Sequence, residues 1–124
     1  MSNLSLPTMS FPNLERLLDK RTSLTLGYAT TATRDPHKRT IHVLHHGNEI
    51  ARLTPMTLWV SNAGYSSSTT RSRLNKILLA NGIPFSVGQK SYEQILTNHD
   101  DNTRQPFTGE AQFIRDDNQE WELV

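Results

Sequence analysis

Hydroxyl and basic side chains gather at one point of the chain, where a predicted strand gives way to a predicted helix. Residues 62–75 read Asn-Ala-Gly-Tyr-Ser-Ser-Ser-Thr-Thr-Arg-Ser-Arg-Leu-Asn, with a glycine turn, five hydroxyl residues and then two arginines. The first turn of a helix leaves backbone N–H groups free, and the helix dipole favours negative charge there. This segment therefore predicts an anion site, and phosphate is the typical occupant of such a site.

The candidate ligand-binding residues belong to this helix start and to a histidine pair earlier in the chain. A phosphate there could accept hydrogen bonds from backbone N–H groups, from hydroxyls and from an arginine fork. The candidates are Tyr65, Ser67, Ser68, Thr69, Thr70, Arg71, Arg73, Asn75, Lys76, His45 and His46. The alternative interpretation is a helix capped by a hydroxyl residue, whose two arginines pair with the acidic C-terminal tail.

Three histidines lie close together in a predicted hairpin. Strand alternation would place His42 and His46 on one face and His45 on the other. Two histidines on one strand face lack a third ligand, so no metal site is predicted. We expect the hairpin histidines to bond a turn or a ligand instead.

The sequence carries no motif for covalent chemistry or for a cofactor. It has no cysteine, no Gly-x-Ser-x-Gly elbow, no Walker loop and no dinucleotide fingerprint. We therefore favour a protein that is not an enzyme and needs no cofactor, with a small hydrolase acting on a phosphate ester as an alternative. Among the aromatic residues, Tyr65 is the best candidate for stacking on a base, whereas Trp59 is expected in the core.

Length and charge describe one small domain with an uneven charge distribution. The 124 residues fit a single domain, 1–124, with an N-terminal arm over residues 1–12. Residues 16–90 carry a net charge of +8 and residues 91–124 carry −6. This asymmetry predicts an anionic partner for the basic body, or a tail that folds onto it. No long apolar run suggests a membrane span, so we expect a soluble, intracellular protein.

Apolar spacing and turn residues predict an α+β fold. Residues 12–20 and 69–80 read as helices, and residues 22–33, 41–45, 49–53 and 57–61 read as strands of an antiparallel meander. We expect a short strand over residues 85–87 and a turn over residues 88–90. Residues 92–96 could be a strand or a helix, and residues 98–106 read as a polar loop. Residues 110–115 and 120–124 read as a C-terminal hairpin. The prediction is a small antiparallel sheet with one principal helix packed on it.

Three segments together carry a family resemblance: Leu26–Thr31, Val43–Ala51 and Gly64–Asn75. They resemble a widespread group of short, uncharacterised bacteriophage proteins with a Thr-rich first strand and a Leu-His-turn-Ile strand pair. The helix start of that group reads Gly-aromatic-x-Ser/Thr-x-Thr-Thr-Arg-x-Arg-x-Asn. The resemblance covers about residues 24–94 and implies a phage origin and a small α+β fold, but no chemistry.

These observations predict a phage protein of the host cytoplasm that binds a phosphate-bearing ligand, either a nucleic acid or a signalling nucleotide. One concrete form of this function is the inhibition of a host defence. The partner would then be a signalling nucleotide or, as the other candidate, a host protein. The competing class is a structural or assembly protein that docks through its N-terminal arm and acidic tail. The large apolar residues of the tail, from Phe107 to Val124, predict that it buries a face and that the protein forms a homo-oligomer.

Overall fold

The computed structural model describes residues 6–124, which form two helices and ten strands. The helices are α1 (Phe11–Leu18) and α2 (Ser68–Ala80). The strands are β1 (Ser23–Gly27), β2 (Thr30–Arg34), β3 (Ile41–His45), β4 (Asn48–Leu53), β5 (Thr57–Ser61), β6 (Phe85–Lys90), β7 (Glu93–Asn98), β8 (Thr103–Pro106), β9 (Glu110–Arg115) and β10 (Trp121–Leu123).

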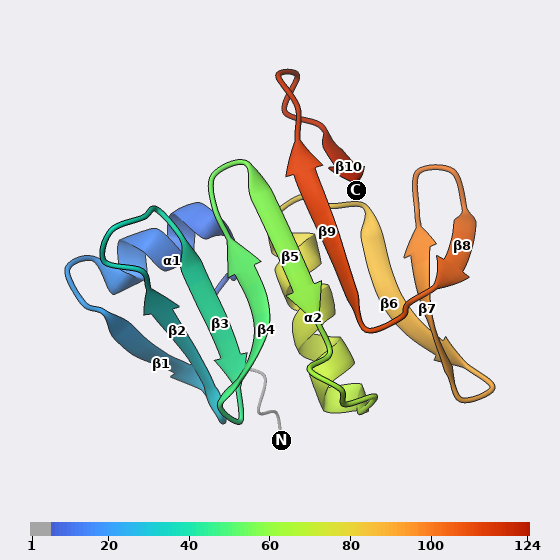
Figure 1. The fold of residues 1–124 in the computed structure, drawn as a ribbon, viewed down its shortest axis with the longest axis horizontal. Helices are drawn as coiled ribbons and strands as arrows, with labels where there is room; N and C mark the ends of the chain where they lie inside the picture. Colours follow the sequence, from blue (N-terminus) through green and yellow to red (C-terminus); the bar gives the residue numbers. More distant parts are fainter. Residues whose placement is uncertain (1–5) are drawn as a thin grey trace.

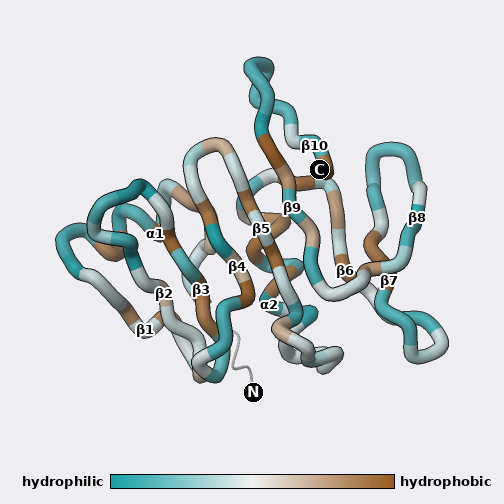
Figure 2. Tube along the Cα trace, in the orientation of Figure 1, coloured by the Kyte–Doolittle hydropathy of each residue, from teal (hydrophilic) through white to brown (hydrophobic). Residues whose placement is uncertain are grey.

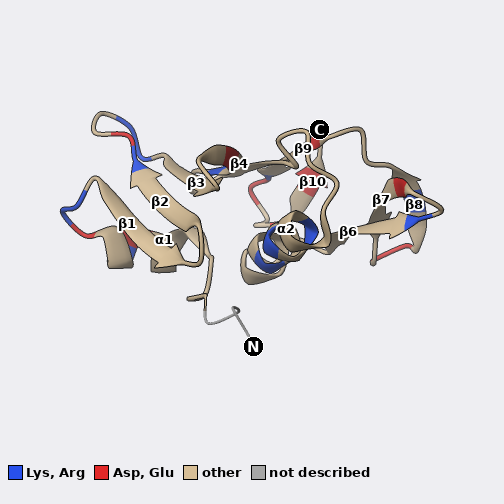
Figure 3. Ribbon diagram, turned by 90° about the horizontal axis from the view of Figure 1, so that it is seen from below, with Lys and Arg blue, Asp and Glu red and all other residues tan. Residues whose placement is uncertain are grey.

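The strands form two antiparallel sheets (Figure 1). The larger has seven strands in the order β1-β2-β3-β4-β5-β9-β10, and the smaller has three in the order β6-β7-β8. Seen edge-on, both helices lie on the same side of the larger sheet (Figure 3). In the described part of the chain, no helix covers its other face. Neither helix of residues 6–124 has the length and apolar character to cross a membrane.

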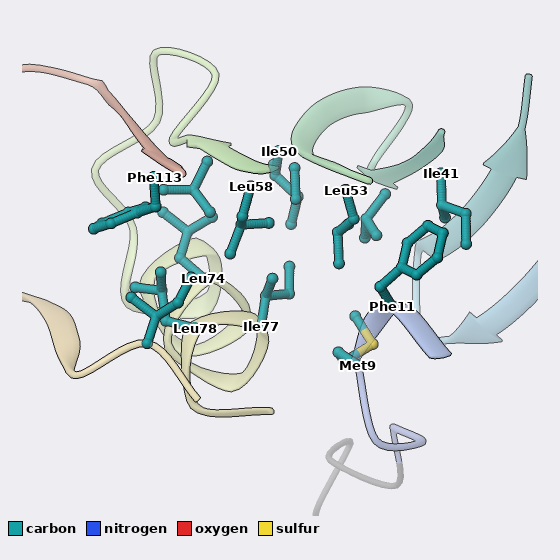
Figure 4. Packing of buried hydrophobic residues seen from close by; sticks show 14 of the residues in the cluster. Met9, Phe11, Ile41, Ile50, Leu53, Leu58, Leu74, Ile77, Leu78 and Phe113 are labelled. Carbon is teal, nitrogen blue, oxygen red and sulfur yellow. The ribbon is translucent and has the colours of Figure 1, made fainter. Parts of the chain in front are cut away.

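The hydrophobic core lies between the larger sheet and the two helices (Figure 4). Inward-facing residues alternate along the strands, as with Leu58 and Val60 of β5. Helix α2 buries Leu74, Ile77 and Leu78 against them, at the i, i+3, i+4 spacing of one helix face. Apolar segments accordingly concentrate on α2 and the central strands, whereas the β7–β8 and β9–β10 loops are hydrophilic (Figure 2).

The predicted fold class is confirmed: an antiparallel meander, a principal helix packed on it and a C-terminal hairpin. One predicted strand is wrong, because residues 22–33 form the hairpin of β1 and β2. Its turn places Ala29 at φ 49°. Turns of this conformation favour Gly or Asn, so Tyr28-Ala29 gave no turn signal in the sequence.

The three-stranded sheet is the main element that the sequence did not predict. Residues 88–90 belong to β6 rather than to a turn, and the predicted loop 98–106 contains β8. The turn lies instead at Ser91 and Tyr92, with φ values of 53° and 70°. The ambiguous segment 92–96 is mostly strand, within β7.

The N-terminal arm is partly built into the fold. Helix α1 begins at Phe11, within the predicted arm, and Ser10 is its N-cap. Met9 is buried in the core, so the segment before the helix packs against the body. Residues 1–5 of the predicted arm lie outside the described residues.

Trp59 is not a core residue, contrary to the prediction. It alternates with the buried Leu58 and Val60, so it lies on the sheet face that the helices do not cover. The Arg52 guanidinium lies 4.8 Å from the centroid of the indole ring, and the indole N–H donates to Glu110 at 2.9 Å.

The acidic tail joins the body through backbone pairing and burial rather than through charge. Strand β9 pairs with β5 along its length, and Phe113 is fully buried. Within residues 6–124, ion pairs join Arg39 to Glu15 and Arg52 to Glu49, and His42 contacts the same Glu49. None of them links the tail to the body, so the helix arginines have no acidic tail partner there.

Candidate functional site

A cavity of about 480 Å³ lies at one end of the larger sheet. The β1–β2 turn, the β3–β4 turn and the N-terminus of α2 meet there, at the bottom of the view in Figure 1. Its lining residues are Tyr28, His45, His46, Asn48, Ile50, Asn62, Ala63, Tyr65, Ser67, Thr69 and Thr70. Small-molecule sites typically enclose about 300–1,000 Å³, so the cavity has the size of such a site.

The start of α2 presents free backbone donors to this cavity. Ser67 is the N-cap, and its Oγ accepts the Thr70 N–H at 3.2 Å. The hydroxyls of Ser67 and Thr70 are 3.0 Å apart. The N–H groups of Ser68 and Thr69 have no helical carbonyl four residues before them, and no hydrogen bond within residues 6–124 uses them. The run of serines and threonines in the sequence predicts Ser68 or Thr69 as the N-cap, and this prediction is wrong by one or two residues.

A tight turn between β5 and α2 positions the Tyr65 ring at the cavity. The Asn62 side chain accepts the Gly64 N–H at 2.9 Å, and its amide donates to Gln94 at 2.7 Å. Ala63 and Gly64 both have positive φ, at 55° and 84°. The chain reverses over these residues, and the half-exposed Tyr65 ring is left beside the helix start.

The two neighbouring histidines face the same cavity, because regular strand alternation ends at the hairpin turn. Strand β3 ends at His45, and His46 occupies the turn at φ 52°. The two imidazole centroids are 4.3 Å apart. The prediction that His45 points away from His46 is therefore wrong. His42 instead bonds Glu49 on the open sheet face.

His45 is buried and its imidazole is held in the neutral form. It is 5% exposed, and Nδ1 lies 3.4 Å from Thr30 Oγ1. Burial, with smaller contributions from the charge of Arg73 and from His46, lowers the pKa of His45 below its ordinary 6.5. Within residues 6–124 no three His, Asp or Glu side chains gather as a metal site.

Arg73 lies inside the protein, behind the cavity wall, rather than at its surface. Its side chain is fully buried and donates to Thr30 Oγ1 at 2.8 Å, to the Tyr28 carbonyl at 3.2 Å and to the Thr69 carbonyl at 3.4 Å. No carboxylate in residues 6–124 pairs with it. The sequence predicts an arginine fork that binds the ligand directly. Arg73 instead places a buried positive charge beneath the site.

Several other predicted site residues lie outside the cavity lining. Arg71 turns back to the Ser66 carbonyl at 2.7 Å and to Gln89 at 2.6 Å. Lys76 lies further along α2, beside the segment that precedes α1. Ser68 is exposed and does not line the cavity. The predicted residues that the structure brings together at the cavity are Tyr65, Ser67, Thr69, Thr70, His45 and His46.

Asn75 connects α2 to β6 and does not reach the cavity. Its side chain donates to the Val87 carbonyl at 2.9 Å and accepts the Val87 N–H at 2.7 Å, as a neighbouring strand would. We expect Asn75→Ala to destabilise the fold by about 2–3 kcal/mol, because both backbone groups lose their partner. Urea unfolding measures this loss. An unchanged unfolding midpoint would contradict the structural role of Asn75.

Five lining residues were missing from the sequence prediction: Tyr28, Asn48, Ile50, Asn62 and Ala63. The Asn62-Ala63-Gly64 turn was visible in the sequence as a turn, but not as part of a cavity wall. Tyr28 belongs to a hairpin turn that had no turn signal. Ile50 reaches the cavity at a β-bulge, where β4 carries one extra residue opposite Val43 and Leu44.

The lowered pKa of His45 makes the stability of the fold depend on pH. Unfolded His45 takes up a proton near its ordinary pKa of 6.5, whereas folded His45 does so only at lower pH. The unfolded state therefore binds more protons in this window, and stability falls as the pH drops through it. Urea unfolding at about pH 7.5 and 5.5 should show this fall. His45→Gln should make it shallower, and an equal slope in both proteins would contradict the prediction.

Comparison with protein families places this fold and site in a phage family. The family model described as Kyanoviridae Gp96 protein matches residues 15–116, well over half of the chain. The chain belongs to this family, which confirms the resemblance to short bacteriophage proteins. The match includes all three segments that carried the resemblance and every residue that lines the cavity. Comparisons with curated proteins and with solved structures found no match.

Proposed function

We propose that this phage protein binds a small phosphate-bearing ligand, such as a nucleotide, in the cavity at the start of α2, without converting it. The observation that carries the proposal is the buried charge of Arg73. It has no carboxylate partner in residues 6–124 and lies directly behind Tyr28 and Thr69 of the cavity wall. An anion in the cavity would serve as its counter-ion.

Two further features support an anionic group at this end of the cavity. The free N–H group of Thr69, which lines the cavity, lies at the start of a helix of thirteen residues, whose dipole favours negative charge at its N-terminus. The Thr69 hydroxyl is a further donor, and so is whichever of the Ser67 and Thr70 hydroxyls does not donate to the other. No aspartate or glutamate lines the cavity to oppose an anion.

The remaining walls suit an organic ligand rather than a bare ion or a long polymer. Tyr28 packs edge-on against His46, with ring centroids 5.8 Å apart, and Tyr65 lies beside the helix start. Such rings can stack on a nucleobase. No lysine or arginine lines the cavity, whereas grooves for single strands are positively charged along the backbone. A mononucleotide therefore fits better than a nucleic acid.

The family supports a role in infection, and the missing catalytic motifs support binding alone. A phage protein that sequesters a signalling nucleotide would withdraw it from a host defence, which is the concrete form of the proposal. A nucleotide incubated with the protein and Mg²⁺ should be recovered unchanged after heat release. Substrate loss at sub-stoichiometric protein would replace the binding function by phosphate-ester hydrolysis.

A charge placed in the cavity tests the proposal. Thr69→Asp puts a carboxylate in the first turn of α2, where an acid stabilises a helix by about 0.3–1 kcal/mol, so the fold should remain intact. The same carboxylate repels a phosphate. Mononucleotides should raise the melting temperature of the parent chain. In Thr69→Asp we expect their affinity, measured by calorimetry, to fall about tenfold or more.

The matched control is Ser68→Asp, which adds the same charge one residue away, outside the cavity lining. Its effect on affinity should be clearly smaller. If both variants bind mononucleotides as tightly as the parent does, the ligand lies elsewhere. If neither inorganic phosphate nor any mononucleotide stabilises the parent chain, the proposed function is wrong.

A further inference from the structure

The buried His45 side chain has one nitrogen that the protein leaves unused. Nδ1 faces Thr30, and the Ala29 carbonyl also lies within hydrogen-bonding reach of the ring. No side-chain hydrogen bond found within residues 6–124 involves Nε2. The only buried side-chain polar atoms without a partner in that range belong to Gln94 and Arg115. His45 lines the cavity. Nε2 therefore opens on the cavity, where its hydrogen-bond partner is solvent or a ligand.

The contacts of Thr30 determine which imidazole nitrogen carries the proton. The Thr30 hydroxyl donates its single hydrogen to the Tyr28 carbonyl at 2.8 Å. Its oxygen accepts from Arg73 Nε at 2.8 Å, because a guanidinium can only donate. The contact between Thr30 Oγ1 and His45 Nδ1 can then be a hydrogen bond only if Nδ1 donates. This arrangement favours the tautomer of neutral His45 that has its proton on Nδ1 and its lone pair on Nε2.

We infer that His45 recognises an N–H or O–H donor on the ligand. The ligand of the proposed site is then a nucleotide that places its phosphate at the start of α2 and a base or ribose donor against Nε2. This inference rests on the proposed function, and it adds a second, chemically opposite contact. The helix start selects an acceptor, and His45 selects a donor.

The groups around His45 favour a neutral ring, which can accept a hydrogen bond, over a protonated ring. Arg73 approaches from α2 and His46 from the turn, and both disfavour a positive charge on the ring. The Thr30 hydroxyl of β2 is not ionised, and the Ala29 carbonyl of the β1–β2 turn favours the protonated ring. Burial and the charge of Arg73 outweigh that carbonyl, so the pKa of His45 is lowered. No carboxylate lines the cavity to stabilise a proton on Nε2. The neutral ring with an exposed lone pair is therefore the state that meets the ligand.

The tautomer can be measured on the full chain without any ligand. Long-range ¹H–¹⁵N correlation spectra separate protonated from unprotonated imidazole nitrogens, and loss of signals in His45→Gln assigns the ring. Above the pKa of His45 we expect a proton on Nδ1 and none on Nε2. A proton on Nε2 in the free protein would overturn the inference.

Ligand analogues test the contact itself. The probe is whichever of the four ribonucleoside 5′-monophosphates binds the full chain most tightly. One analogue has the base N–H groups methylated, and the other lacks both ribose hydroxyls. Since an unpartnered buried polar group costs about 1–3 kcal/mol, one analogue should bind about tenfold more weakly. Inorganic phosphate, which retains only the anionic contact, should bind more weakly than either analogue.

The outcomes separate this inference from the proposed function. If the parent nucleotide and both analogues bind equally, the cavity binds phosphate but His45 does not select a donor, and only this inference is overturned. If the chain binds none of the nucleotides, the proposed function and the donor contact are both overturned. Loss of affinity with one analogue, together with a proton on Nδ1, supports both.

Discussion

Removal of residues 107–124 is expected to abolish the folded state. The deletion takes away β9, which lies between β5 and β10 in the larger sheet, and leaves the β5 edge unpaired. It also removes Phe113, which is fully buried, and Phe107, which is nearly so. Loss of each buried phenylalanine side chain costs about 3–5 kcal/mol, and a domain has only about 5–15 kcal/mol of stability. Thermal unfolding followed by circular dichroism should show no cooperative transition.

A shorter deletion is the control for this prediction. Removal of residues 117–124 takes away only β10, the edge strand, and leaves β9 paired with β5. It loses the hydrogen bond from the Trp121 indole to the Asn81 carbonyl, at 2.9 Å. This protein should still unfold cooperatively, at a lower temperature than the parent. A cooperative transition of the longer deletion at the parent's melting temperature would show that β9 is dispensable.

Elements with strong local signals were predictable from the sequence, and those made by unusual turns were not. Helix α2 was found because its apolar residues recur at helical spacing between a hydroxyl cap and Asn81-Gly82. The turn at His46-Gly47 was found because glycine tolerates positive φ. The turns at Ala29 and at Ser91-Tyr92 place ordinary residues at positive φ, a cost that tertiary pairing must offset.

The candidate site was predictable only where it is local in sequence. Residues 62–70, which the sequence marks as a site, form one wall of the cavity. The other walls come from the β1–β2 and β3–β4 turns, which lie beside residues 62–70 only in the folded sheet. The inward direction of Arg73 has a signal in the sequence. Arg73 lies four residues before Ile77 and three after Thr70, on the buried stripe of α2. The charge of Arg73 favours a surface position, but its spacing along the helix predicts a buried one.

Replacement of Arg73 should be the most damaging single substitution near the cavity. In Arg73→Ala the Thr30 hydroxyl and the Tyr28 carbonyl lose a charged donor, and the side-chain volume becomes a void. Unpartnered buried groups cost about 1–3 kcal/mol each, and large-to-small changes in a core add a cavity cost. We expect a loss of about 3–5 kcal/mol in urea unfolding. Arg71→Ala, in the same motif but solvent-accessible, should cost about 1 kcal/mol.

Arg73→Met separates the charge of this residue from its volume. Methionine fills much of the space but supplies neither donors nor charge, so stability should fall by less than in Arg73→Ala. If the buried charge attracts the phosphate, Arg73→Met should still weaken mononucleotide binding, because the cavity loses its positive charge. Replacing buried charges by apolar residues of similar size can also be stabilising. A more stable Arg73→Met protein that binds no nucleotide would show that the guanidinium serves the ligand rather than the fold. A more stable variant with unchanged binding would contradict both roles.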